Sequence, residues 1–398
     1  MPYTIFDDAR LTHFAAQPTP GDAATRVITP ADFDRAMTEI TCWEGYAPTP
    51  LVSLPQLADD LSLNEVLYKN ESPRFGLGSF KALGGAYAAL RVLQRQISAA
   101  LGRDVTMEDI RTGALATEAA KITLVSATDG NHGRSLAWGC QRFGAPCRIY
   151  IHAEVSEARA EAMRALGAEV IRIAGDYDAS VALARDEAAA HGWFVVSDTS
   201  WPGYTDPPRD VMAGYGVMTR ECCDAMDRPP THVFLQGGVG GLAASVAAGL
   251  VQYWGADAPS VVVVEPELAA CLIESARQGR ATTVQIESET IMAGLSCGEP
   301  SGMAWDILSE LARDYLTIPD TLIGPTIRRL ARPIGIDPAI EAGESGVAGL
   351  AGLIAAARQA PLRAALGLKP TSRVLLIGSE GVTDPDIFAA LMRERADG

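Results

Sequence analysis

The sequence predicts an α/β protein with two doubly wound domains, each built on a parallel sheet with helices on both faces. Short runs rich in valine and isoleucine alternate with longer alanine-rich segments of helical character, which is typical of βαβ units. The 398 residues exceed what one hydrophobic core can organise, since single cores stop growing at about 250 to 300 residues. We therefore expect a large domain from residues 1–87 and 209–398 and a small domain from residues 88–208.

Strands and helices alternate along most of the chain. Seven runs are predicted as strands: 122–126, 147–151, 169–173, 194–197, 232–235, 260–265 and 374–377. The helix predicted over 156–166 shows the pattern between them. Ser156 can cap its first turn, Met163 continues an apolar face, and Gly167 ends the helix. The apolar stretch 239–254 is shorter than the roughly 20 residues of a membrane crossing, so we expect it to be a buried helix.

Composition and charge exclude several classes of partner. The formal net charge of −16 gives a negative field that repels nucleic acid and anionic membrane surfaces. The first eight residues lack a basic segment followed by an apolar core, so we expect a cytoplasmic protein. The seven cysteines include no CxxC pair, and the five histidines do not cluster with them at zinc-site spacings. We therefore predict no metal site.

One lysine, Lys81, lies at the start of a predicted amphipathic helix directly behind a glycine-containing turn. Its neighbours Phe80, Ala82 and Leu83 would partly desolvate the amine, which lowers a lysine pKa and supplies a neutral Schiff-base nucleophile. The alternative is a surface lysine whose stem lies along apolar surface.

Three glycine-containing loops follow predicted strands: Ser126–Gly133, Gln236–Gly241 and Ile377–Gly381. Ligands of doubly wound folds bind at the carboxyl ends of the strands, where such loops collect. The second loop has four glycines in five positions, so its backbone amides can approach a phosphate closely.

The second loop also permits a nicotinamide-dependent oxidoreductase. Gly238, Gly240 and Ala243 match the dinucleotide fingerprint, and Glu265 follows Gly238 by 27 residues, near the expected place of a ribose-binding acid. That reading leaves Lys81 and the first loop unexplained.

Lys81 and these loops, in this order and spacing, resemble the fold type II pyridoxal-phosphate enzymes, and within them the diaminopropionate ammonia-lyase family. The more selective matching segments are Arg74–Leu77, Ala127–Arg134, Asp198–Tyr204, Thr290–Pro300, Gly343–Gly346 and Ser379–Gly381. The resemblance covers the chain from about Cys42 onward.

The resemblance implies pyridoxal 5′-phosphate as the cofactor, bound by residues that address its aldehyde, phosphate, ring hydroxyl and pyridine nitrogen: Lys81, Phe80, Asn131, Gly237, Gly238, Val239, Gly240, Gly241 and Ser379. Lys81 would form the Schiff base and the glycine loop would bind the phosphate. Asn131 would bond the ring oxygen and Ser379 the pyridine nitrogen. A hydroxyl there does not enforce a pyridinium, which favours elimination; better-known members carry threonine at this position.

The resemblance further implies α,β-elimination of ammonia from 2,3-diaminopropionate, in the D form, the L form or both, to give pyruvate and two ammonia. Ser126, Thr128, Asp129 and Asp198 would contact this amino-acid substrate. Asp129 stands where general dehydratases of this fold carry a small residue; it can hold a β-ammonium or take a Cα proton. Asp198 would be the second base. Either carboxylate could instead cap a helix or turn, and we expect His132 to be structural.

Alternatives on the same scaffold are a serine or threonine dehydratase and a β-replacement synthase. The resemblance also places Cys271 and Cys297 as a cysteine pair near the active site, either as a disulfide or as two thiols. It implies a homodimer.

Overall fold

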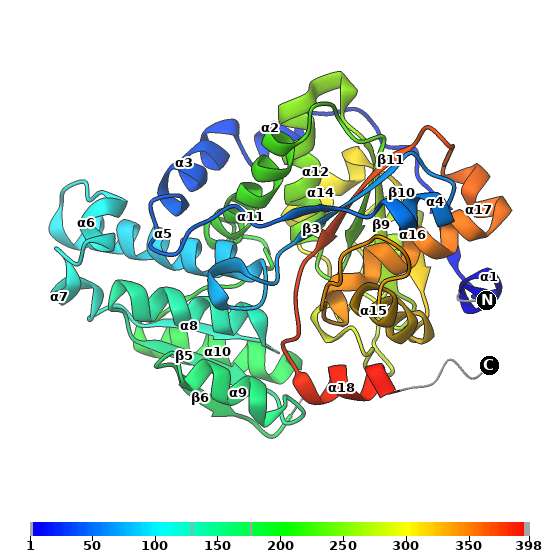
Figure 1. The fold of residues 1–398 in the computed structure, drawn as a ribbon. Helices are drawn as coiled ribbons and strands as arrows, with labels where there is room; N and C mark the ends of the chain where they lie inside the picture. The colour runs from blue at the N-terminus through cyan, green and yellow to red at the C-terminus, as the bar shows by residue number, and fades with distance from the viewer. Residues whose placement is uncertain (1–2, 129, 176, 394–398) are drawn as a thin grey trace. The chain divides into compact units, whose positions relative to one another are not determined.

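The computed structural model describes residues 3–128, 130–175 and 177–393 (Figure 1). It divides into two compact units. Unit 1 comprises residues 1–30, 47–79 and 218–398, and unit 2 comprises residues 31–46 and 80–217. The predicted domain breaks, after residues 87 and 208, fall inside helices α5 (Lys81–Leu101) and α11 (Asp206–Ala225).

Unit 1 is built on a seven-stranded sheet in the order β1-β10-β9-β8-β11-β3-β2. The five inner strands are parallel, and the edge strands β1 and β2 run antiparallel to their neighbours. The strands are β1 (Thr12–Ala15), β2 (Leu51–Ser53), β3 (Glu65–Asn70), β8 (His232–Gln236), β9 (Ser260–Pro266), β10 (Ala312–Ile318) and β11 (Arg373–Gly378).

Helices cover the sheet of unit 1: α1 (Thr4–Asp8), α2 (Ala23–Arg26), α4 (Pro55–Asp60), α12 (Gly241–Trp254), α13 (Cys271–Gln278), α14 (Gly302–Leu311), α15 (Ile323–Ala331), α16 (Ala348–Arg358), α17 (Ala360–Ala365) and α18 (Pro385–Arg393). Helix α16 packs against β8, β9 and β10, and its Leu353 joins Phe234 and Val262 in one core cluster. The predicted buried helix is confirmed as α12. Within the described ranges, no helix combines the length and apolar character that a membrane crossing needs.

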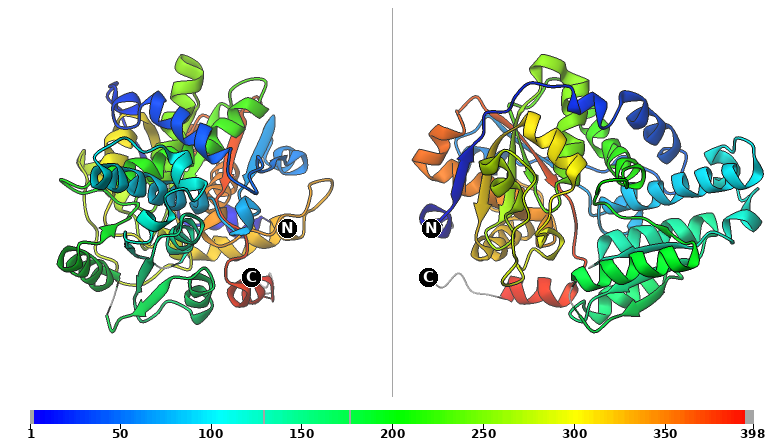
Figure 2. Two further views of the ribbon diagram at one scale, coloured as in Figure 1. Left: turned by 90° about the vertical axis from the view of Figure 1, so that its left-hand side faces the viewer. Right: turned by 180° about the vertical axis from the view of Figure 1, so that it is seen from behind.

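Unit 2 contains a parallel four-stranded sheet in the order β6-β5-β4-β7. Its elements are β4 (Leu124–Ala127), β5 (Cys147–Ile151), β6 (Glu169–Arg172), β7 (Phe194–Val195), α3 (Pro30–Ile40), α5, α6 (Met107–Arg111), α7 (Ala116–Ala119), α8 (Asn131–Phe143), α9 (Glu157–Arg164) and α10 (Tyr177–His191). Successive strand residues face opposite sides of a sheet. Ile149 lies next to Gly133 of α8, and Tyr150 packs with Ala184 of α10. Helices therefore cover both faces of the small sheet (Figure 2).

The predicted fold class is confirmed, and so are the seven predicted strands, with shifts of up to two residues at their ends. Four strands were not predicted. Two are the short antiparallel edges, and the other two, β3 and β10, are interrupted by charged residues such as Lys69 and Asp314, which hide their apolar character. In the predicted example helix, Ser156 Oγ accepts from the Arg159 amide at 3.3 Å, and Gly167 has a left-handed φ of 85°.

Candidate active site

Lys81 is the first residue of α5 in unit 2, and its amine meets a carboxylate. The Nζ atom forms an ion pair with Asp198 Oδ2. The same Nζ lies 5.5 Å from the centre of the Phe80 ring and 5.8 Å from that of Tyr215. The Lys81 side chain is 20% exposed. A partly buried amine between two aromatic rings and a carboxylate is poised for chemistry rather than for solvation alone.

Glycines allow neighbouring helices to approach the start of α5. A Cβ atom at Gly84 would lie 2.4 Å from the Tyr215 ring, and one at Gly85 would lie 2.6 Å from Ser135 Oγ. Ser135 Oγ in turn donates to the Lys81 carbonyl at 2.5 Å and accepts from the Ala86 amide at 3.1 Å. The two glycines after Lys81 are therefore packing positions that fix the lysine's helix against α8 and α11. Sequence reasoning missed both Ser135 and Tyr215, whose contacts span distant segments.

Asp198 is held ionised. Burial by itself would raise the pKa of Asp198, but the positive charge of Lys81 and the hydrogen bond from Lys81 lower it below the ordinary value. The segment carrying Asp198 is anchored by Tyr204, whose hydroxyl accepts from the Ser197 amide and donates to the Val195 carbonyl, both at 2.9 Å. A half-buried carboxylate on a tethered segment can act as a positioned base.

His132 is buried on α8 beside this pair. Its Nε2 lies 2.9 Å from the Val196 carbonyl, and its Nδ1 lies 3.9 Å from Asp198 Oδ2. Burial lowers the pKa of His132, and the nearby ammonium of Lys81 lowers it further, while Asp198 opposes this effect. The ring is therefore neutral near pH 7.

The first glycine-containing loop joins β4 to α8. Thr128 Oγ1 accepts from the amides of Gly130 and Gly133 at 3.2 and 3.3 Å, so its hydroxyl supports the helix start. Ser126 is fully buried, and Asn131 is the first residue of α8. Asp129, predicted to contact the substrate, lies outside the described residues.

The glycine-rich loop of unit 1 lies between β8 and α12. Gly238 and Gly240 adopt left-handed φ values of 63° and 93°, and a Cβ atom at Gly237 would lie 2.5 Å from Glu265 Cγ. The first helical hydrogen bond of α12 runs from the Ala244 amide to the Gly240 carbonyl. The Gly237 amide donates to the Val264 carbonyl at 2.8 Å, and the Gly240 amide donates to the Gly237 carbonyl at 3.2 Å. The amides of Gly238, Val239 and Gly241 are the ones that can bind an anion at this helix start. Gly237 to Gly241 thus form a glycine cradle whose backbone donors suit an anion such as phosphate.

Ser379 follows β11 and is buried in unit 1. Gln236 Nε2 donates to the carbonyls of Gly346 and Ile377 at 3.0 and 2.5 Å and lies 3.3 Å from Ser379 Oγ. Because Gln236 Nε2 is a donor, it can engage only a lone pair of Ser379 Oγ, so the Ser379 hydroxyl keeps its own proton for another acceptor. Gln236 was not predicted, although it directly precedes the glycine loop.

Two further matching segments pack around these groups. Gly294 N donates to Ser345 Oγ at 3.1 Å, and Ser345 N donates to Glu380 Oε1 at 2.9 Å. Cys271 Sγ lies 3.5 Å from the Gly238 carbonyl. Cys271 and Cys297 are not bonded to each other in the structure.

The geometry contradicts the dinucleotide alternative. Glu265 is fully buried, and its two carboxylate oxygens accept from the amides of Leu272 and Ile273 at 2.8 and 2.7 Å. Burial raises the pKa of Glu265 to about 8. Its carboxyl group caps α13 and lies under Gly237, so it is not available to bind a ribose.

A buried network of charges anchors the segment that leads toward Lys81, within unit 1. Arg74 forms ion pairs with Glu71 and Glu221 at 2.8 and 2.7 Å, and Lys69 forms one with Glu221 at 2.5 Å. Phe75, the next residue, has a φ of 51°, which is rare for a side chain of this size. Two cations and two carboxylates fully buried together hold this strained turn in one conformation.

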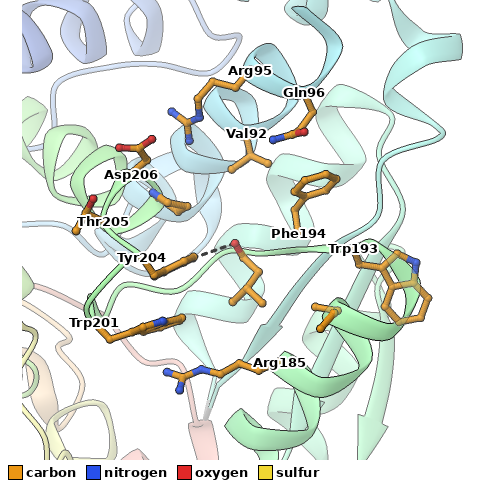
Figure 3. Close-up of a pocket in the computed structure, with 15 residues that line it drawn as sticks. Val92, Arg95, Gln96, Arg185, Trp193, Phe194, Trp201, Tyr204, Thr205 and Asp206 are labelled. Atoms are coloured by element: carbon orange, nitrogen blue, oxygen red, sulfur yellow. Dashed lines mark hydrogen bonds between the residues drawn. The ribbon is translucent and has the colours of Figure 1, made fainter. Parts of the chain in front are cut away.

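A cavity of about 620 Å³ lies beside the segment that follows Asp198 in unit 2 (Figure 3). Arg95 on one side of it forms an ion pair with Asp210 at 2.6 Å. On the other side, Arg185 lies 3.7 Å from the centre of the Trp201 ring, which stacks on Tyr204 at 3.9 Å. Neither Lys81 nor Asp198 lines this cavity, which is therefore separate from the reacting groups.

The residues present fit a pyridoxal phosphate in chemical type. Unit 1 offers a glycine cradle for the phosphate and a buried hydroxyl donor at Ser379. Unit 2 offers the amine of Lys81 beside a carboxylate. Among the described residues, no group of three or more His, Cys, Asp or Glu side chains could hold a metal ion.

Comparisons with known proteins agree with this arrangement. The family model described as "Pyridoxal-phosphate dependent enzyme" matches residues 42–380. The diaminopropionate ammonia-lyase of Escherichia coli (strain K12) is 39% identical over 347 residues, which cover 85% of this chain and 86% of that protein. A probable D-serine dehydratase of Pseudomonas aeruginosa is 28% identical over 290 residues, 68% of this chain and 63% of that protein.

A solved structure gives the same result for the fold. The diaminopropionate ammonia-lyase from Escherichia coli, in complex with an aminoacrylate-PLP azomethine reaction intermediate, matches with a TM-score of 0.86 at 33% identity and covers 97% of each chain. The lysine, the glycine cradle and these matches lead to one conclusion: this chain belongs to the fold type II pyridoxal-phosphate-dependent enzymes, in the family of the diaminopropionate ammonia-lyases.

Proposed function

We propose that this enzyme eliminates ammonia from 2,3-diaminopropionate, in the D form, the L form or both, and that pyruvate and a second ammonia follow. The observation that carries the proposal is the Lys81 amine paired with the Asp198 carboxylate in a mostly buried site. The 39% identity to diaminopropionate ammonia-lyase supports the choice of substrate.

The predicted cofactor-binding residues address different parts of the cofactor. The loop formed by Gly237, Gly238, Val239, Gly240 and Gly241 would hold the phosphate. Its free donors there would be the amides of Gly238, Val239 and Gly241, because those of Gly237 and Gly240 donate to backbone carbonyls. Ser379 would donate toward the pyridine nitrogen. Lys81 would hold the cofactor through its aldehyde, with Phe80 as its neighbour in the chain, and Asn131 would bind the ring hydroxyl. When bound, the cofactor withdraws electrons from the amino acid and so acidifies its Cα–H bond.

Two carboxylates divide the proton transfers. Asp198 takes the Cα proton from one enantiomer and Asp129 takes it from the other, since a base must lie on the side from which the proton departs. The amine of Lys81 is placed to donate a proton to the departing ammonia. Ser126 and Thr128, in the loop before α8, orient the substrate.

Asp129 also selects the substrate class. A carboxylate there pairs with the β-ammonium of a diamino acid, whereas the β-hydroxyl of serine carries no charge to pair. This distinguishes the proposal from a serine or threonine dehydratase and from a β-replacement synthase on the same fold.

The test is pyruvate release from D- and L-diaminopropionate compared with D- and L-serine, for the wild type and for Asp129→Ala. The wild type should prefer diaminopropionate, and Asp129→Ala should lose about 10²-fold or more on at least one enantiomer. The control is Asp104→Ala, which removes an exposed carboxylate from the same unit. Equal rates on serine and diaminopropionate would overturn the substrate assignment in favour of a dehydratase.

Three further features belong to the proposal. The protein acts as a homodimer, which light scattering of the purified enzyme tests. It works in the cytoplasm, which fractionation of the source cell tests. Cys271 and Cys297 are the candidate disulfide pair, and peptide mapping without reductant distinguishes the bonded pair from two thiols.

A further inference from the structure

The strongest signal that the proposed chemistry does not use is a buried ring nitrogen of His132. Nε2 of this histidine lies 2.9 Å from the Val196 carbonyl, which can only accept, so Nε2 carries the hydrogen. In the neutral ring, Nδ1 then presents a lone pair. Nδ1 is buried and has no hydrogen-bond partner within the described part of the chain.

A buried acceptor without a hydrogen-bond donor lowers the stability of the folded protein. A carboxylate close to Nδ1 suggests why the acceptor is retained. Nδ1 lies 3.9 Å from Asp198 Oδ2, the oxygen that also pairs with Lys81. An ionised carboxylate has no hydrogen to donate, so in this state it cannot satisfy Nδ1. A protonated Asp198 can, because it has gained an O–H donor.

We propose that His132 is a positioning residue that accepts a hydrogen bond from Asp198 once that carboxylate has taken the substrate proton. The inference rests on the proposed role of Asp198 as a base. The substrate Cα–H bond breaks, its electron pair stays with the substrate, and an O–H bond forms on Asp198. The carboxyl then turns from Lys81 toward Nδ1, which closes their 3.9 Å separation to hydrogen-bond distance. In that position its O–H donates to Nδ1, and the bond stabilises the protonated acid.

The acceptor at Nδ1 would compensate for the low pKa of Asp198, which makes this carboxylate a weak base. Burial raises the pKa of Asp198, but the charge of Lys81 and its hydrogen bond hold that pKa below the ordinary value, which favours the ionised form and disfavours uptake of a proton. An acceptor that interacts with the protonated form alone lowers the barrier to that uptake. The benefit is confined to the substrate enantiomer whose proton Asp198 receives.

Two substitutions separate this role from a structural one. His132→Asn places an amide oxygen near the position of Nδ1 and gives up the bond to Val196, whereas His132→Gln reaches the position of Nε2 and gives up the acceptor at Nδ1. Asp198→Asn first identifies the enantiomer that depends on Asp198. On that enantiomer, His132→Gln should lower kcat by about tenfold or more, and His132→Asn should keep more of the activity.

The other enantiomer is the internal control, since it uses the same fold and cofactor. Its kcat should change by less than about twofold in either variant. Cofactor absorbance and urea unfolding show that both variants are folded and loaded. Equal losses on both enantiomers, or better retention by Gln than by Asn, would overturn the proposal and leave His132 a structural residue. If Asp198→Asn spares both enantiomers, the assignment of Asp198 as a base fails instead.

Discussion

The glycine loop of unit 1 and the Lys81 region of unit 2 present different chemical groups: backbone amides in the loop and ionisable side chains around Lys81. The loop presents backbone amides over a floor formed by Glu265, and its shape is set by left-handed glycines. The Lys81 region presents ionisable side chains, Asp198 and His132 among them, whose pKa values are displaced by one another. Backbone amides hold an anion without changing protonation state, whereas side chains can exchange protons. Unit 1 thus offers a phosphate backbone donors that do not titrate, whereas unit 2 holds the amine and the groups that can exchange protons.

The largest effect should come from Lys81→Ala. The variant loses both the covalent anchor and the ion pair with Asp198, so pyruvate formation should fall by about 10³-fold or more. The wild type should show a visible absorbance that borohydride abolishes, and the variant should lack that absorbance. Lys121→Ala, an exposed lysine in the same unit, is the matched control and should behave as wild type. Full activity in Lys81→Ala would show that the Lys81 region does not supply the reactive amine.

The next effect should come from Gly237→Ala. Its new Cβ would lie 2.5 Å from Glu265 Cγ, which forces the loop to shift. Cofactor affinity should fall by about tenfold or more, with the pH dependence of turnover unchanged.

Gly279→Ala provides the comparison for that substitution. This glycine has a left-handed φ of 66° at the end of α13 with open space around it. The variant should cost about 1 kcal/mol of stability and leave cofactor titration unaffected. An equal loss of cofactor affinity in the two variants would mean that the loop at Gly237 has no special role in binding the cofactor.

A smaller effect should come from Tyr204→Phe. The substitution removes the hydroxyl that links Ser197 and Val195 and so loosens the segment carrying Asp198. We expect a loss of about 1–3 kcal/mol in the free energy of unfolding and a severalfold lower kcat. Tyr253→Phe, whose hydroxyl bonds Asp224 at the surface, should change neither. Unaltered kcat in Tyr204→Phe would show that the segment is positioned by other contacts.

The smallest effect on turnover should come from Glu265→Gln. This substitution should instead change how the free energy of unfolding depends on pH. The folded pKa of Glu265, about 8, exceeds its unfolded value, so this group's contribution is present at low pH and is lost as the pH rises through 8. Gln does not titrate. The variant's stability relative to wild type should therefore increase by about 1–4 kcal/mol between pH 5 and 8.5 in urea unfolding.

Glu267→Gln, which removes an exposed carboxylate two residues away, should show no such trend. A pH-independent difference for Glu265→Gln would mean that the carboxyl is not protonated under α13.

Much of the anchoring region could be predicted from sequence. The glycine loop, Ser379 and the loop before α8 follow strands, and ligand groups gather at strand ends in doubly wound folds. The proton-transfer region was predictable only in its list of residues. The pairing of Lys81 with Asp198, separated by 117 residues, depends on how α5 and the end of β7 pack. For Glu265 the sequence was misleading. Its spacing from the glycines fits a ribose-binding acid, but in the structure its buried carboxyl group caps α13.

The fold class, the cofactor family and the lysine proposed to anchor the cofactor could all be inferred from local patterns and from short segments with selective residues. Tertiary structure alone decided which groups share protons. A pKa depends on burial and on charges a few ångströms away, and those neighbours come from distant parts of the chain. Lys81, Asp198 and His132 lie on three separate segments, and only folding places the bare Nδ1 of His132 beside the carboxylate.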